Sequence, residues 1–298
     1  MSTITKLKQG SVVVGADGSP GGDAAVEWAV RHATARRRPL TLVTGTGDPG
    51  NSAEILGSAE AHRVLHMKAR KVSDHVLGVV ERVAPGLDVD VMLPLQDARQ
   101  ALIDISDRAS VVVVGTRGRG PVRSLLLGSV STAVAAHAQC PVVVVRAGDR
   151  DDDGDLGRVV VGVDGSPASA SAVDFAFDLA SMEGRELEAV HCWSTDETFI
   201  DPSSYQQRLD HLDAHERLLT EALAGYAEKY PDVVVSANLP DVNPVAGLVE
   251  RSETAAVVVV GSRGRSGVKS LVGSVSRSVI EHAHCTVVVV RPRERRPG

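Results

Sequence analysis

The chain has 298 residues, a length that favours two domains. Hydrophobic residues make up 43% of it and aromatic residues only 3%, so valine, leucine and alanine must supply the core, as in parallel sheets covered by helices. The formal net charge of −6, together with the shortage of aromatic rings for base stacking, argues against a nucleic-acid-binding surface.

The first residues and the cysteines indicate the compartment. The N-terminal segment has no apolar stretch of the signal-peptide kind, and no apolar run approaches the ~20 residues that span a membrane. Cys140, Cys192 and Cys285 are an odd and sparse set, which favours a reducing environment. We expect Cys140 and Cys285 to be small buried residues. The sequence therefore predicts a cytoplasmic protein with no membrane segment and no disulfide bond.

Strand and helix patterns alternate along the first half, after a loose polar tail at residues 1–9. Valine-rich or alternating runs predict strands at residues 11–15, 40–44, 87–93, 111–115 and 142–145. Helical periodicity predicts helices at residues 23–38, 59–83 and 97–109, with one more beginning at Ser129. Ser19 and Pro20 are a typical helix N-cap followed by a proline at the first helical position.

The stretch from Val111 to Arg146 carries the clearest chemistry. Two valine runs flank a loop that holds Gly115, Gly118 and Gly128, separated by two and then nine residues, and Ser129 follows. Glycine lets backbone N–H groups approach an anion, and a helix N-terminus adds free N–H donors and about half a positive charge. Loop glycines alone are usually turn residues. The flanking strands and the serine at the helix start favour a polyphosphate site instead.

This pattern occurs a second time. The segment 257–291 repeats the strand, glycine loop, helix and strand, and GRVVVGVDGSP at 157–167 repeats GSVVVGADGSP at 10–20. Asp17 thereby matches Asp164 at an offset of 147. A period this long indicates tandem domains rather than a solenoid.

The second half accordingly repeats the order of elements. Strands are predicted at residues 159–163, 187–192, 233–237, 257–260 and 286–291, and helices at residues 167–182, 203–230, 244–252 and 275–283. Alternating strands and helices give parallel sheets with right-handed crossovers. We predict an α/β protein of two tandem, doubly wound, five-stranded parallel-sheet domains, whose ligands bind beyond the carboxyl ends of the strands at the switch point.

The predicted domains are residues 1–147 and 158–298, joined by an acidic linker at 148–157. The linker is part of the stretch AGDRDDDGDLG. Neighbouring carboxylates without a fold around them make a weak cation site, so we expect a solvated connection.

In its glycine loops and in the aspartate after the first strand, the chain resembles a tandem universal stress protein of the UspA-like family. The nucleotide-binding members carry G-x2-G-x9-G-[S/T] after the fourth strand and an aspartate after the first. The loop glycines, Ser129 and Asp17 match that pattern, and the resemblance covers the chain except its tails and linker. It implies a Rossmann-like fold of the adenine nucleotide alpha hydrolase type, with ATP as ligand, with or without Mg²⁺.

The resemblance also implies roles for individual residues. Phosphates would lie against Gly115, Arg117, Gly118, Gly128, Ser129, Val130 and Ser131, the two serines adding hydroxyl donors. The nucleoside would lie against Gly15, Ala16, Asp17 and Val43. Asp17 would accept hydrogen bonds from ribose or adenine, or hold a metal through water. The matching candidates in the second half are Gly162, Asp164, Val190, Gly261, Gly264, Gly273, Ser274, Val275 and Ser276.

The second glycine loop is one residue shorter than the first. Gly264 to Gly273 encloses eight residues where Gly118 to Gly128 encloses nine. One residue supplies up to about 3.5 Å of reach and about 100° of helical rotation. We therefore expect the second half to bind ATP more weakly than the first, or in an altered pose.

Other functional motifs are absent. The sequence has no G-x4-G-K-[ST] motif, no G-x-G-x-x-G after the first strand and no recognisable Ser/His/Asp order. Two histidine pairs, His62/His66 and His211/His215, have i, i+4 spacing, but no acidic residue completes a metal site by spacing. We expect both pairs to lie on solvated helix faces.

Three functions remain open. The favoured one is an ATP-binding regulatory stress protein with little or no turnover that acts through an unknown protein partner, because no positioned lysine or evident catalytic base accompanies the loop. The others are a slow ATP hydrolase or adenylyl-transfer enzyme, and a structural stress protein that binds no nucleotide. A homodimer through the last strands is also expected, since Val142–Val145 and Val287–Val290 are apolar enough to pair at an edge.

Overall fold

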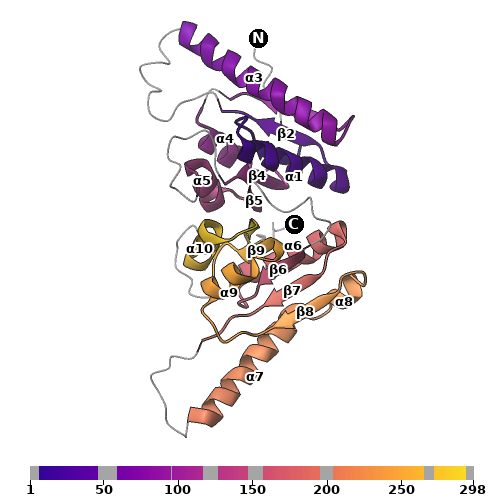
Figure 1. Cartoon of the computed structure of the whole chain (residues 1–298), viewed down its shortest axis with the longest axis vertical. Coiled ribbons are helices and arrows are strands. Elements are labelled where there is room, and N and C mark those ends of the chain that lie inside the picture. The colour runs from indigo at the N-terminus through magenta and orange to yellow at the C-terminus, as the bar shows by residue number, and fades with distance from the viewer. Residues whose placement is uncertain are drawn as a thin grey trace, which may run out of the picture. The chain divides into compact units, whose positions relative to one another are not determined.

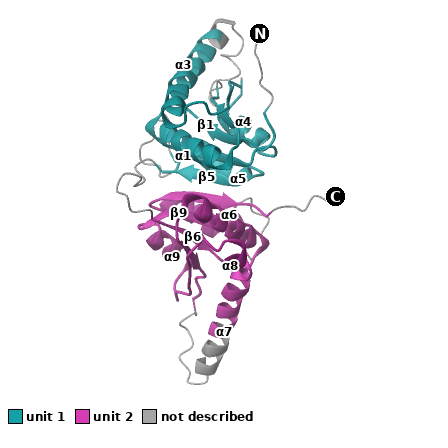
Figure 2. Cartoon of the chain, turned by 90° about the vertical axis from the view of Figure 1, so that its right-hand side faces the viewer, with its two compact units in different colours: residues 1–148 teal, residues 149–298 magenta. Residues whose placement is uncertain are grey.

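A computed structural model of the chain describes residues 7–45, 59–94, 96–116, 127–146, 157–194, 204–264 and 272–292. The chain divides into two compact units, residues 1–148 and 149–298, coloured separately in Figure 2. Residues 148–156 of the predicted linker lie outside the described ranges. None of the described helices is long and apolar enough to cross a membrane.

Unit 1 is a parallel sheet with the strand order β3-β2-β1-β4-β5 in its described part (Figure 1). Every strand pair with a described register is parallel. The strands are β1 (Val12–Gly15), β2 (Leu40–Val43), β3 (Val89–Met92), β4 (Val111–Gly115) and β5 (Val142–Val145). The helices are α1 (Pro20–Arg36), α3 (Ala59–Val83), α4 (Ala98–Ile105) and α5 (Ser129–His137).

Unit 2 repeats this arrangement with the order β10-β9-β6-β7-β8, again with parallel pairs. Its strands are β6 (Arg158–Gly162), β7 (Leu187–Val190), β8 (Val235–Asn238), β9 (Ala255–Gly261) and β10 (Thr286–Val290). Its helices are α6 (Pro167–Glu183), α7 (Ser204–Leu223), α8 (Tyr226–Lys229), α9 (Pro244–Arg251) and α10 (Ser274–His282).

Helices cover each sheet in pairs. In unit 1, α1 packs against α3, and α4 packs against α5. In unit 2, the corresponding pairs are α6 with α7 and α9 with α10. The chain reverses its direction across the sheet after β3 and after β8, so the two helix pairs of a unit belong to opposite faces. The predicted α/β class is confirmed for both units.

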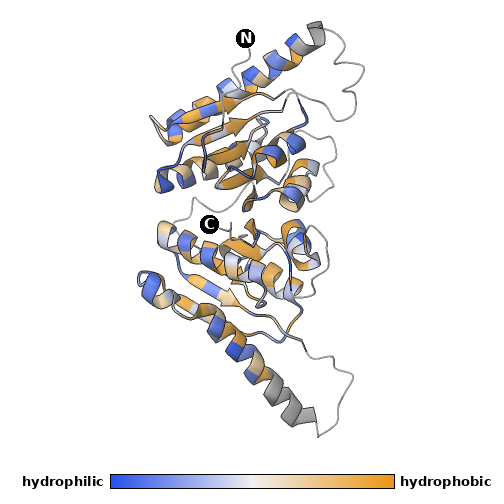
Figure 3. Cartoon of the chain, turned by 180° about the vertical axis from the view of Figure 1, so that it is seen from behind, coloured by the Kyte–Doolittle hydropathy of each residue, from blue (hydrophilic) through white to orange (hydrophobic). Residues whose placement is uncertain are grey.

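Valine builds the core, as the composition predicts. Val12, Val13 and Val14 of β1 and Val112 and Val113 of β4 are fully buried. The central strands β1, β4 and β9 accordingly contain only apolar residues and glycine. The helices carry both hydrophobic and hydrophilic residues (Figure 3). Because a strand buried on both faces excludes polar residues from consecutive positions, these runs lack the usual alternation.

The first helix of each unit begins as predicted. The Ser19 hydroxyl accepts a hydrogen bond from the Gly22 N–H at 3.1 Å, and Ser166 accepts one from the Ser169 N–H at 3.1 Å. Each cap is followed by a proline. The helix predicted at 23–38 therefore begins earlier, at Pro20, and ends at Arg36.

Two other predicted helix ranges are wrong. The helix expected at 203–230 is interrupted at Gly225, which has φ 79°, and resumes as α8. The Tyr226 ring stacks on Phe177 at 4.4 Å between centroids, and this contact holds the separate last turn against α6. The helix expected at 97–109 ends at Ile105, after which the Ser106 and Arg108 N–H groups donate to carbonyls three residues earlier, as in a tighter turn.

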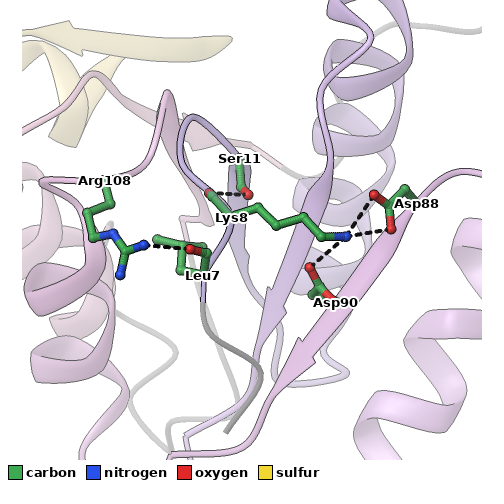
Figure 4. Close-up of polar contacts among 6 residues, drawn as sticks. All are labelled: Leu7, Lys8, Ser11, Asp88, Asp90 and Arg108. Atoms are coloured by element: carbon green, nitrogen blue, oxygen red, sulfur yellow. Dashed lines mark hydrogen bonds and ion pairs between the residues drawn. The ribbon is translucent and has the colours of Figure 1, made fainter.

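The residues just before β1 are attached to the fold rather than loose (Figure 4). Lys8 Nζ lies 2.8 Å from an Asp88 carboxylate oxygen and 3.2 Å from one of Asp90. Arg108 donates to the Leu7 carbonyl at 2.8 Å, and the Leu7 side chain is buried. The polar tail predicted at residues 1–9 is therefore fixed from Leu7 onward.

Candidate functional site

The predicted site residues of unit 1 meet at the carboxyl ends of its central strands. Gly15 pairs with Val43 across β1 and β2, and the Ala16 N–H donates to the Val43 carbonyl at 2.9 Å. β4 lies on the other side of β1, so Gly115 ends at the same edge. The chain leaves β1 and β4 in opposite directions along the sheet, which is the arrangement in which doubly wound proteins form a ligand-binding crevice.

Unit 2 reproduces this edge. Gly162 pairs with Val190, and the Val163 N–H donates to the Val190 carbonyl at 2.8 Å. β9 lies beside β6, so Gly261 ends next to Gly162. The structure thus brings together the strand-end candidates that the sequence predicts for each half.

The two aspartates hold similar turns. Asp17 Oδ1 accepts from the Ser19 N–H at 3.0 Å and from the Ser19 hydroxyl at 2.6 Å. Asp164 Oδ1 accepts from the Ser166 N–H at 2.9 Å. Both residues are half-buried. Each carboxylate therefore fixes the turn into its first helix while remaining at the edge of the crevice.

Gly115 and Gly261 are required by the packing of the fold. A Cβ at Gly115 would collide with the Gly21 carbonyl in the first turn of α1. A Cβ at Gly261 would lie 2.8 Å from the Ala168 carbonyl carbon and 2.9 Å from the Ser169 nitrogen of α6. Backbone atoms cannot move away as a flexible side chain can, so these glycines let strand and helix meet closely.

Both glycine loops close in the same way. The Gly128 N–H donates to the Thr116 carbonyl at 2.7 Å, and the Gly273 N–H donates to the Ser262 carbonyl at 2.7 Å. The backbone angles are also alike, with φ −75° and ψ 155° at Gly128 and φ −67° and ψ 157° at Gly273. The missing residue of the second loop therefore leaves the position of the following helix unchanged. The loop interiors, with Arg117 and Gly118, lie outside the described residues.

The helices after these loops begin without a side-chain cap. α5 and α10 follow Gly128 and Gly273, and no side chain bonds their first N–H groups in the described structure. The helices α1, α4, α6 and α9 instead begin at Ser19, Asp97, Ser166 and Asn243, each of which accepts a backbone N–H. The uncapped helix starts stand at the carboxyl ends of β4 and β9, where the sequence predicts phosphate binding.

Nothing in the packing around Gly273 requires a glycine. Its φ and ψ suit any residue, and a Cβ there would meet its nearest described atoms at 3.6 to 3.7 Å, which is ordinary contact. One of those atoms is the Gly264 nitrogen, so the two ends of the loop lie together. A Cβ at Gly264 would lie 2.9 Å from Asp164 Oδ2, which places the loop beside the aspartate.

The serine hydroxyls predicted to bind phosphate are not all available. The Ser131 hydroxyl donates to the Gly115 carbonyl at 2.6 Å, and the Ser276 hydroxyl donates to the Gly261 carbonyl at 2.6 Å. A hydroxyl has one hydrogen, so neither can donate it to a phosphate while these bonds exist. In the described structure both hydroxyls are therefore engaged by carbonyls within the fold. Ser129 and Ser274 are exposed in the first helical turn, followed by the half-buried Val130 and Val275.

A histidine pair in unit 2 was not predicted. His191 is only 5% exposed, and its Nδ1 lies 2.6 Å from the Val163 carbonyl oxygen. Its Nε2 lies 2.7 Å from Nδ1 of His215, which was expected on a solvated helix face. That expectation is wrong for His215, because α7 turns it towards β7. The only sequence signal is the polar residue His191 directly after the apolar Ala189 and Val190 of β7.

The described residues hold no group of three or more histidine, cysteine, aspartate or glutamate side chains that could bind a metal ion. Cys140 and Cys285 are buried thiols, and the free cysteines also include the half-buried Cys192. A ligand would therefore meet backbone N–H groups, a carboxylate and an apolar wall in each unit. Backbone N–H groups suit an anion such as a phosphate, and a carboxylate accepts hydrogen bonds from hydroxyl groups.

Comparisons with known proteins agree with this architecture. A family model described as the universal stress protein family matches residues 10–146 and 156–291. A universal stress protein of Mycolicibacterium smegmatis is 38% identical over 293 residues, which cover 95% of this chain and 97% of that protein. Universal stress protein Rv2623 of Mycobacterium tuberculosis is 38% identical over 291 residues, covering 94% and 96%.

A solved structure shows the same fold over the whole length. The crystal structure of a universal stress protein from Archaeoglobus fulgidus superposes with a TM-score of 0.69 at 20% sequence identity. The match covers 97% of this chain and 98% of that one. The tandem organisation is therefore shared with that protein.

Proposed function

Because the chain belongs to the universal stress protein family, we propose that it binds ATP at the carboxyl edge of each sheet, more weakly in unit 2. It would act as a regulatory stress-response protein with little or no turnover, through a protein partner in the cytoplasm. The homodimer through the last strands remains a prediction.

The observation that carries this proposal is the way α10 begins, together with the start of the corresponding helix α5. A helix N-terminus has N–H groups without an intrahelical partner and a partial positive charge, so it needs either a cap or an anion. The helices α1, α4, α6 and α9 begin with Ser, Asp or Asn side chains as caps, whereas α5 and α10, like the single-turn α8, begin at glycines. Since Gly273 has room for a Cβ in the ligand-free protein, we attribute its lack of a side chain to an approaching phosphate.

The remaining groups suit a nucleoside. Val43 and Ala16 in unit 1, and Val190 in unit 2, are buried apolar residues at the crevice wall that could contact a base. Asp17 and Asp164 would accept hydrogen bonds from ribose hydroxyls. Mg²⁺ keeps most of its water and binds chiefly to phosphates and one or two carboxylates, so the ion would arrive with ATP rather than fill a protein cage.

The proposal is tested by titrating the full chain with Mg–ATP in a calorimeter, beside the variants Gly128→Ala and Gly273→Ala. Each substitution puts a methyl group where a phosphate would lie, so each should weaken one of two sites by at least tenfold. Gly78→Ala is the matched control, because a Cβ at this helical glycine of α3 has only a side-chain atom of Arg82 near it, at 3.8 Å. Mg–ATP binding that is absent, or equal in all four proteins, would exclude the proposed site.

A further inference from the structure

The histidine pair of unit 2 lies where it can act on the proposed site. His191 is the first residue after β7 and directly follows Val190 of the crevice wall. The carbonyl that its Nδ1 contacts belongs to the peptide bond between Val163 and Asp164. The nitrogen of that same peptide donates to the Ser169 hydroxyl at 3.1 Å. The peptide that carries Asp164 is therefore held on both sides.

Helix α7 reaches this turn by two contacts. His215 of α7 bonds His191, and its ring also lies 5.4 Å from the Trp193 ring. One turn later, the Leu218 side chain lies within 3.0 Å of the Cβ position at Gly165, the residue after Asp164. Movement of α7 would therefore reach the Asp164 turn through His191 and through Leu218.

Hydrogen counting limits the charge that the pair can hold. The Val163 carbonyl only accepts, so His191 Nδ1 must carry a hydrogen, and only one hydrogen can lie between His191 Nε2 and His215 Nδ1. The neutral pair and the singly protonated pair satisfy both bonds. Two protonated rings would place a hydrogen on each facing nitrogen and break the contact.

We propose that the His191–His215 pair is a pH-responsive latch that positions the Asp164 turn and so makes the unit 2 site, but not the unit 1 site, sensitive to acidification. This inference rests on the proposed nucleotide site. Unit 1 has Thr44 at the position that matches His191, 147 residues earlier, so it lacks the pair. The latch therefore distinguishes the two units.

The direction of the pH effect follows from proton binding. Below about pH 6.5 free imidazoles take up protons. Two separated neutral rings can then bind two additional protons, whereas the latched pair can bind only one. The unlatched state then binds more protons, and acidification favours it by up to tenfold per pH unit. The ionisable residues nearest to the pair along the chain include Asp164, which follows Val163, then Asp213, Glu216 and Arg217 beside His215 on α7, and Asp241, which pairs with Trp193. All of them, and His211 one turn earlier on α7, stay in every variant below.

His215→Asn is the variant that tests the latch. The asparagine amide can reach the position of Nδ1 and, by flipping, can donate to or accept from His191 Nε2. The contact should therefore survive at all pH values without the second titrating ring. His215→Ala removes the contact at every pH.

Trp193 reports on the latch independently of ATP. In a Trp28→Phe background it is the only tryptophan, and its emission should change between pH 8 and 5 as the adjacent imidazole is protonated and moves. That transition should vanish in His215→Asn. Unit 2 affinity for Mg–ATP is measured in a Gly128→Val background, with and without His215→Asn. Between pH 7.5 and pH 5.5 this affinity should fall in both proteins compared. The fall should be at least fivefold larger in the protein that keeps His215 than in the His215→Asn variant.

The outcomes separate this inference from the proposed function. If ATP binds but the two proteins share one pH profile of affinity, the latch is refuted. If ATP does not bind at all, the proposed function fails, and the pH transition in Trp193 emission alone tests the latch. A transition that depends on His215 then supports the latch, and identical transitions overturn it.

Discussion

Two glycines at either end of the second loop should respond in opposite ways to the same substitution. Gly261→Ala places a Cβ 2.8 to 3.0 Å from three atoms of Ala168 and Ser169, two of them in the backbone, and such overpacking typically costs about 1–3 kcal/mol. Gly273→Ala meets its neighbours at 3.6 to 3.7 Å with φ −67°. It should leave stability unchanged or raise it by about 0.4–1 kcal/mol, because alanine restricts the unfolded chain.

Mg–ATP affinity should separate the two variants further. Calorimetric unfolding of the full chain measures the stability of each variant, and titration with Mg–ATP measures its unit 2 site. We expect Gly273→Ala to keep its melting temperature and lose affinity, whereas Gly261→Ala loses melting temperature. A Gly273→Ala protein that is destabilised as much as Gly261→Ala would refute the inference that this glycine serves a ligand rather than the fold.

Three further outcomes are expected. Asp17→Ala should weaken ATP binding at unit 1 about tenfold or more, and the lost bonds to Ser19 should cost about 1–2 kcal/mol without unfolding the protein; a larger loss of melting temperature would assign Asp17 a structural role. A nucleotide count by calorimetry should give one tight and one weaker site per chain, and two equal sites would contradict the effect of the shorter loop. Asp97→Ala should lower the free energy of unfolding by about 1 kcal/mol at pH 7. The hydrogen bond from Arg99 lowers the pKa of Asp97, so this stabilisation is complete above the ordinary value of 3.8 and is lost as pH falls through the lowered pKa. Urea unfolding at pH 7 and below pH 3 should show the deficit shrink, and a constant deficit would argue against an ionised cap.

The amino-acid sequence was enough to predict the repeat, the order of strands along the chain and the strand ends that form the candidate site. These follow from local signals. Unbroken valine runs at Val111–Val114 can only be buried strands of a covered sheet, and Ser19-Pro20 specifies a helix start whatever surrounds it. The parallel topology then places Asp17 and Gly115 at one edge, since right-handed crossovers leave few alternatives.

Which polar groups are available at that edge could not be predicted from the sequence, because it depends on how the elements pack. The Ser131 hydroxyl is used by the Gly115 carbonyl 16 residues away, and a one-dimensional motif cannot show that competition. Gly261 and Gly273 look alike in the sequence, but only the first faces a helix backbone. His215 lies 24 residues from His191, and their contact exists because α7 packs against the β7 end of the sheet. Hydrogen-bond partners and steric room depend on which elements meet in space, and that is information no local pattern contains.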